Sequence, residues 1–239
     1  MKLKTNLHLH TNDDPEDHIA YSAYEVIDRA AALGFDALAL TCHNRSAWCE
    51  DYASYAADQN ITLIRGIEST ISETPEVRGK HVLILGAQPD VEEVRTFTEL
   101  ADYKQKYPDI VVIAPHPYFD PFLSLQGLAE KYIDLFDAIE HSWFYSHWLN
   151  RNKKAIALAE SYQKPLIATS DTHFLDHLNE HFTYIDAPDR SENSILGAIK
   201  EGSVTIQTRP HKLFSEMIIP QVRFTLQNTL HKRRSTRSR

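Results

Sequence analysis

Histidines and carboxylates recur at short spacings in this chain, and two such pairs are suited to coordinating a metal ion. His8 and His10 are separated by one residue, and so are Asp171 and His173. Residues i and i+2 of a strand point to the same face of a sheet, so each pair can approach one ion from one side. Imidazole and carboxylate are ligands of borderline divalent metals. The spacings therefore indicate metal binding.

The composition leaves few other ways to bind an anionic substrate. The 239 residues include 13 histidines but only two cysteines, Cys42 and Cys49, and the formal net charge is −8. The seven glycines never occur at the spacing of a Rossmann or P-loop phosphate cradle. An acidic body also argues against broad contact with the phosphates of nucleic acid. A bound phosphate would therefore depend on metal cations.

Buried strands must position these residues. Short apolar runs rich in Val, Ile and Leu alternate about seven times with helical patterns, as expected of a parallel sheet with helices outside it. The expected strands cover residues 5–10, 37–41, 62–67, 81–85, 110–114, 138–140 and 166–169. The sequence predicts a single α/β barrel domain over residues 1–210. Residues 211–239 are expected to form an appended helix and a basic tail.

Six of the seven expected strands end in a possible metal ligand, and in a β/α barrel the active site is built at that end. Besides the two pairs, this end carries His43, Glu68, His116 and His141. His147 lies six residues beyond His141, and either of the two can face the site. His81 begins the fourth strand, so we expect it at the opposite end of the barrel.

A clustered metal site would supply both charge and a nucleophile. Divalent ions orient phosphoryl oxygens and lower the pKa of bound water toward about 7, which gives a hydroxide for in-line attack. Asp171, as a ligand beside that water, can relay its proton. Arg45, two residues after His43, can neutralise a substrate oxygen. The loop over residues 13–18 holds four carboxylates and His18, and it would lie over the barrel mouth.

Taken in chain order, these motifs resemble the PHP (polymerase and histidinol phosphatase) family. The resemblance rests on His8-x-His10, Thr41-x-His43, Gly66-Ile-Glu68, His116-Pro117 and Ser170-Asp171-x-His173. It implies a distorted, TIM-like (β/α)7 barrel with two or three divalent metal ions, zinc, manganese or iron, at the strand ends. It also implies the hydrolysis of phosphate esters.

The resemblance further implies how the ligands are shared. One metal would be held by two histidines, a glutamate and an aspartate: His8, His10, Glu68 and Asp171. A second would be held by His43, His173 and one residue of the first loop. Glu68 would bridge to a third metal, held by His116 and a residue near His141.

The first loop departs from the family pattern. Many members carry Ser-Asp-Gly shortly after the first histidine pair, where this chain has Asp-Asp-Pro-Glu-Asp. Asp17 is the expected loop ligand and His18 the alternative, because either suits a site shared with His43. Asp14 is expected to matter little, because Pro15 turns the chain between it and Asp17.

These features predict a metal-dependent phosphoesterase acting on a small phosphorylated substrate, a phosphomonoester, a nucleotide or an oligonucleotide. Asp171, Glu68 and Arg45 are the expected catalytic residues. One alternative is an amidohydrolase-type metal hydrolase, but that family commonly uses a strand-four lysine, and Lys80 stands only at the start of this strand. The other is a non-catalytic metal-binding PHP module, against which the complete ligand set argues.

The sequence also bears on location and partners. No run approaches the roughly 18 apolar residues of a membrane helix, and no apolar signal core precedes His8. Together with two cysteines, this favours a cytoplasmic protein without a membrane partner. The basic run over residues 232–239 is expected to be solvated, with nucleic acid or an anionic surface as its alternative partner.

Overall fold

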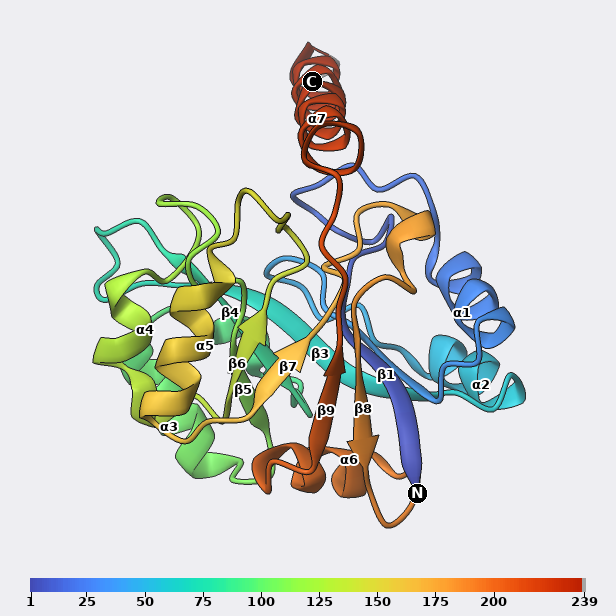
Figure 1. Cartoon of the computed structure of the whole chain (residues 1–239), viewed down its shortest axis with the longest axis vertical. Helices are drawn as coiled ribbons and strands as arrows, with labels where there is room; N and C mark the ends of the chain where they lie inside the picture. The colour runs from blue at the N-terminus through green and yellow to red at the C-terminus, as the bar shows by residue number, and fades with distance from the viewer. Residues whose placement is uncertain (238–239) are drawn as a thin grey trace.

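A computed structural model describes the backbone of residues 1–237 and the side chains of residues 1–232. Over this range the strands form one sheet in the order β7-β6-β5-β4-β3-β2-β1-β8-β9. The two ends of this order, β7 and β9, contact each other, so the sheet is a nearly closed barrel (Figure 1). The expected distorted α/β barrel is therefore confirmed.

The strands are β1 (Lys2–Leu9), β2 (Ala37–Leu40), β3 (Thr62–Ile71), β4 (Lys80–Leu85), β5 (Val111–Ala114), β6 (Ala138–His141), β7 (Leu166–Ala168), β8 (Phe182–Asp186) and β9 (Val204–Gln207). The first seven correspond to the predicted runs. β8 and β9 were not predicted from sequence. β8 is buried on only part of its length, and β9 alternates half-buried and exposed residues. Such strands lack the continuous apolar run of a strand buried on both faces.

The α-helices are α1 (Ala23–Ala32), α2 (Glu50–Asp58), α3 (Phe97–Lys106), α4 (Gly127–Lys131), α5 (Asn152–Ser161), α6 (Glu192–Lys200) and α7 (Ile219–Arg237). α1 begins with a capping box between Ser22 and Glu25. Its buried face, which includes Val26 and Ile27, packs with Leu38 of β2 in one apolar cluster. Burying this face anchors α1 on the outside of the sheet.

The barrel interior is filled by a separate apolar cluster. Leu7, Ile64, Leu83 and Ile113 come from four different strands and pack with Ile195 of α6. The pairing register between β1 and β2 shifts between Asn6 and Leu9. Such a bulge re-aims side chains, and it brings His8 toward the site although its neighbour Leu7 packs in the interior.

Strand β4 runs opposite to its neighbours, pairing antiparallel with both β3 and β5. Its first residues therefore lie at the end of the barrel where the parallel strands finish. The prediction that His81 lies at the opposite end is wrong for this reason. Because β3 extends to Ile71, only residues 72–79 connect the pair, fewer than the dozen or more that a parallel crossover needs.

The segment after the barrel is helical. A six-residue π-helical turn (Leu213–Ile218) leads into α7, which Figure 1 shows rising beyond the barrel, next to the chain of the first loop. The division at residue 210 stays a prediction, and residues 238–239 of the expected basic tail lie outside the described part of the chain. No helix within residues 1–237 has the length and apolar character to cross a bilayer.

Candidate metal centre

Four side chains converge where β1, β3 and β7 end. His8 Nε2 lies 3.2 Å from Glu68 Oε2 and 3.6 Å from Asp171 Oδ1. His10 Nε2 lies 3.4 Å and 3.3 Å from the same two oxygens. In a tetrahedral site with ligands at about 2.0–2.2 Å, the ligand atoms are about 3.3–3.6 Å apart. The four nitrogen-to-oxygen distances lie in or near this range, as expected of ligands to one metal ion.

The chemistry of the four donors also fits a cation. His8 and His10 are fully buried, and the Nε2 atom of each lacks a hydrogen-bond partner within the described residues. Burial by itself would raise the pKa of Glu68, but His81 and His8 hold that pKa well below its usual range. Burial likewise opposes ionisation of Asp171, yet His8 and His173 keep its pKa well below the ordinary value. Both carboxylates are therefore anionic.

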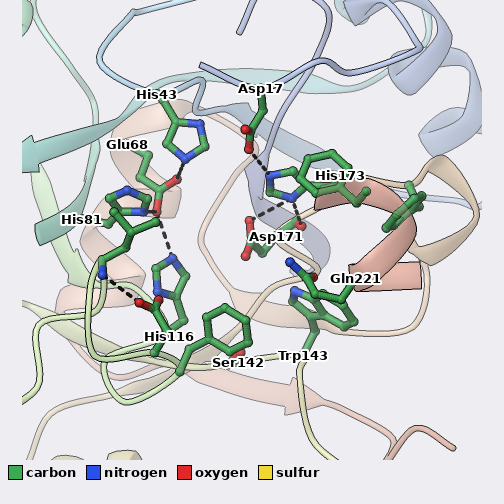
Figure 2. Close-up of a pocket in the computed structure, with 15 residues that line it drawn as sticks. Asp17, His43, Glu68, His81, His116, Ser142, Trp143, Asp171, His173 and Gln221 are labelled. Atoms are coloured by element: carbon green, nitrogen blue, oxygen red, sulfur yellow. Dashed lines mark hydrogen bonds and ion pairs between the residues drawn. The ribbon is translucent and has the colours of Figure 1, made fainter. Parts of the chain in front are cut away.

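Glu68 presents its two oxygens to different groups of histidines (Figure 2). Oε2 faces His8 and His10, and it lies 3.1 Å from His43 Nε2. Oε1 lies 2.8 Å from His81 Nδ1 and 3.0 Å from His116 Nε2. A carboxylate in this position is suited to bridge two ions.

His81 is a site residue that the sequence analysis did not include. It is buried, and burial lowers its pKa below the ordinary value although Glu68 acts in the opposite direction. With His43 and Glu68 it forms a group whose donor atoms all lie within 4.8 Å of one another. The short connection before β4 was not visible in the sequence, because the expected third strand ended at residue 67 and β3 continues to Ile71.

The first loop brings Asp17, and not His18, to the centre. Asp17 Oδ2 lies 3.1 Å from His173 Nε2, and both side chains line the same pocket as His43. The exposed His18 stacks instead on His231 of α7, with ring centroids 4.2 Å apart. Of the two expected loop ligands, Asp17 is the one placed to share an ion with the two histidines.

Asp14 contacts two of the histidines, so the structure gives no support to the expectation that it matters little. Its Oδ2 lies 2.8 Å from His10 Nδ1 and 2.9 Å from His43 Nδ1. Its Oδ1 accepts the backbone N–H groups of Glu16 and Asp17 at 2.8 and 2.9 Å. Carboxylates that hold Nδ1–H in this way fix the tautomer and leave Nε2 for the metal. The backbone bonds of the turn around Pro15 therefore hold the Asp14 side chain in its buried position.

On β6 it is Glu140, and not His141, that reaches the centre. Glu140 Oε1 lies 3.0 Å from His8 Nδ1, and Oε2 accepts the backbone N–H of His116 at 2.6 Å. Neighbouring residues of a strand point to opposite faces, so His141 lies against Asn152 and Tyr145 instead. The structure thus does not bring His141 together with Glu68 and His116.

Arg45 also lies away from the centre. It is exposed, and its guanidinium donates to the Asp13 carbonyl oxygen at 3.4 Å. It does not line the pocket formed by the metal donors, so its expected contact with a substrate oxygen stays a prediction.

The backbone is strained at two of the donors. His116 and Asp171 have φ angles of 29° and 42°, a region that side chains with a Cβ rarely adopt. Such residues cost on the order of 1–3 kcal/mol each and persist where the surrounding structure imposes them. His116 lies two residues beyond the end of β5 and Asp171 three residues beyond the end of β7, where the turn aims the side chain into the site.

Known proteins match this chain in part of its sequence and in its fold. A family model described as PHP-associated matches residues 150–204. A two-domain protein from Bacteroides vulgatus, containing a predicted PHP-like metal-dependent phosphoesterase, matches with a TM-score of 0.67 and 19% identity over 87% of this chain and 65% of its own. This chain thus spans less than two thirds of that protein. No curated protein sequence matches.

Two other solved structures share the fold. The lesion-specific endonuclease Q from Pyrococcus furiosus matches with a TM-score of 0.61 and 16% identity, over 86% of this chain and 58% of its own. An amidohydrolase from Chromobacterium violaceum matches with a TM-score of 0.55 and 17% identity, over 84% and 97%. The family-model match is confined to residues 150–204, and these solved structures share the barrel fold of this chain.

Proposed function

We propose that the protein is a metal-dependent hydrolase of phosphate esters. The observation that carries the proposal is the set of four donor atoms on His8, His10, Glu68 and Asp171, whose spacing fits one ion while two buried imidazole nitrogens lack other partners. Its PHP-like structural neighbours include metal-dependent phosphoesterases and an endonuclease.

The protein would hold two or three divalent ions in all, zinc, manganese or iron, and the remaining donors form the second and third positions. The second position would use His43, Asp17 and His173, and the third would use Glu68, His116 and His81. When bound, such ions neutralise phosphoryl oxygens and lower the pKa of a coordinated water. The third position thus differs from the one expected from sequence, since His81 stands where a residue near His141 was expected.

The protein's own residues have separate tasks in this scheme. Asp14 and Glu140 hold the imidazoles of His10, His43 and His8 in one orientation. Asp171 faces the pocket as an anion and can accept the proton of the attacking water. Ser170, beside Asp171, is the other possible nucleophile. It is buried, and its hydroxyl is hydrogen-bonded to Asn6 and Thr172. This favours attack by water over a phosphoseryl intermediate.

An amidohydrolase reaction is the contrasting outcome. Lys80 does not take the place of the bridging lysine common in that family, because its Nζ donates to the carbonyl oxygens of Pro121 and Phe122 at 2.9 Å. The test is metal analysis of the purified protein with a screen of phosphomonoesters, nucleotides, oligonucleotides and amides under Mn²⁺, Zn²⁺ or Fe²⁺. Ester hydrolysis that a chelator abolishes supports the proposal, whereas turnover of amides alone contradicts it.

A further inference from the structure

The pocket above the metal donors has a second, apolar wall. One side is formed by the imidazoles and carboxylates described above. The other is formed by large apolar side chains from four separate segments: Phe119, Leu123, Trp143, Phe174 and Phe224. The pocket encloses about 630 Å³, including space open to solvent. Figure 2 shows Trp143 and Gln221 across the pocket from Glu68 and His81.

The apolar wall begins at the donors themselves. The ring of Phe224, on α7, lies 4.8 Å from the ring of His173 and 5.7 Å from that of Phe174. The ring of Phe119 lies 6.1 Å from that of His116. A group one or two bonds away from a metal-held phosphate would therefore meet aromatic rings.

The wall is fixed in place by packing. Trp143 is buried, and its ring packs edge-on against His211 and lies near His177. Phe119 packs edge-on against Phe144, with ring centroids 4.8 Å apart. Rings held in this way form a preformed apolar surface, which is the ordinary basis of selectivity in a small-molecule pocket.

The pocket offers no permanently cationic side chain. None of its lining residues, all within the described part of the chain, is a lysine or an arginine, and Asp17 and Asp120 add negative charge. One phosphate can be held by the metal ions. A second phosphate or a carboxylate on the same substrate would face apolar rings and acids with no lysine or arginine to neutralise its charge, which is costly.

We propose that this wall selects phosphomonoesters whose alcohol carries an aromatic or similarly flat apolar group, and that it rejects esters of small polar alcohols and substrates with a second phosphate. The inference rests on the proposed hydrolase function. It assigns the selection to Trp143, Phe119 and Phe224, which touch the alcohol portion of the substrate and not its phosphate.

The test compares two esters of primary alcohols, 2-phenylethyl phosphate and ethyl phosphate, whose leaving groups are similarly basic. With the metal-loaded protein, kcat/KM is expected to be at least about tenfold higher for the phenylethyl ester, as burial of a ring allows. This ratio is expected to collapse in Trp143→Ala and in Phe224→Ala. Trp148→Ala is the matched control, because Trp148 lies on the same loop, is 90% exposed and does not line the pocket. A ratio near one in the wild type, or an unchanged ratio in both pocket variants, overturns the inference.

A binding measurement separates this inference from the proposed function. Phenylphosphonate is expected to bind the metal-loaded protein at least about tenfold more tightly than methylphosphonate in calorimetry, and Phe224→Ala is expected to remove the difference. If no ester is hydrolysed but this binding preference holds, the proposed reaction is wrong and the proposed selectivity of the apolar wall is supported. Equal binding of the two phosphonates contradicts the wall even in an active enzyme. Should Trp143→Ala fail to fold, Trp143→Phe keeps a ring and is expected to retain part of the preference.

Discussion

Two groups of histidines lie at the same end of this barrel and have opposite electrostatic surroundings. The metal centre surrounds Glu68 with imidazoles, and within the described side chains no lysine or arginine pairs with Glu68 or Asp171. The second group joins His181, at the start of β8, to His211, beyond β9, with Nε2 atoms 2.8 Å apart. Of the two groups, only the metal centre holds carboxylates that no described lysine or arginine side chain neutralises.

In the second group an arginine supplies the positive charge. The Arg209 guanidinium pairs with Glu180 and with Glu216, the latter at 2.9 Å. Burial and the neighbouring His211 lower the pKa of His181 to about 2. In the metal centre, burial would lower the pKa of His8, but Glu68 and nearby carboxylates raise it well above the ordinary value. Buried histidines alone therefore do not indicate a metal site, whereas buried histidines among unpaired carboxylates do.

The strongest test of this contrast is Glu68→Gln. The change removes the one anion that faces both halves of the centre, so the variant is expected to lose at least one equivalent of metal and to lower turnover by orders of magnitude. Metal content is measured by elemental analysis and the fold by circular dichroism. His181→Gln is the matched variant in the second group and is expected to keep full metal content. A Glu68→Gln protein that retains all of its metal would refute the bridging role.

The next test concerns the loop ligand. Asp17→Ala is expected to lose the second metal selectively and to lower kcat by orders of magnitude, because His43 and His173 alone would hold that ion loosely. His18→Ala is expected to leave metal content and rate unchanged, since His18 faces His231 on α7. If both variants behave as the wild type does, the loop is only an acidic turn and the binuclear scheme loses its main support.

A smaller effect is expected at Asp14, which lies behind the ligands. Asp14→Ala frees the Nδ1 atoms of His10 and His43 and removes the acceptor that holds the backbone of Asp17. Loss of such outer partners typically costs about 10- to 100-fold in metal affinity or activity. Competition with a chelator measures the affinity, and the exposed neighbour Glu16→Ala serves as the control. Unchanged affinity in Asp14→Ala would show that the imidazoles need no carboxylate to orient them.

Much of the fold and most of the centre could be predicted from sequence. The seven buried strands appear as continuous apolar runs, and a chemical residue directly after such a run lies at the strand end. This logic placed His8, His10, Glu68 and Asp171 in one region, and the structure brings them together.

The direction in which a strand runs and the register in which it pairs could not be predicted in the same way. His81 was misplaced because an apolar run does not reveal which way its strand runs. On β6 the choice between Glu140 and His141 depends on which of two adjacent residues faces inward, and only pairing settles that. The burial of His181 and His211 could not be predicted either, because β8 and β9 lack a continuous apolar run.

The smallest expected effect is a pH dependence of stability at the second group. The folded protein keeps His181 neutral with a pKa of about 2, whereas the unfolded chain takes up a proton near pH 6.5. Below that pH the unfolded state binds more protons, so stability falls as the pH is lowered, by about 2 kcal/mol at pH 5. His181→Gln removes this contribution, and its free energy of unfolding in urea is expected to fall by about 2 kcal/mol less than that of the wild type between pH 7.5 and 5. Acid release of metal from the first group affects both proteins alike and cancels in the comparison. The exposed His147→Gln is expected to follow the wild type, and parallel curves for all three proteins would show that His181 does not stay neutral in the folded state.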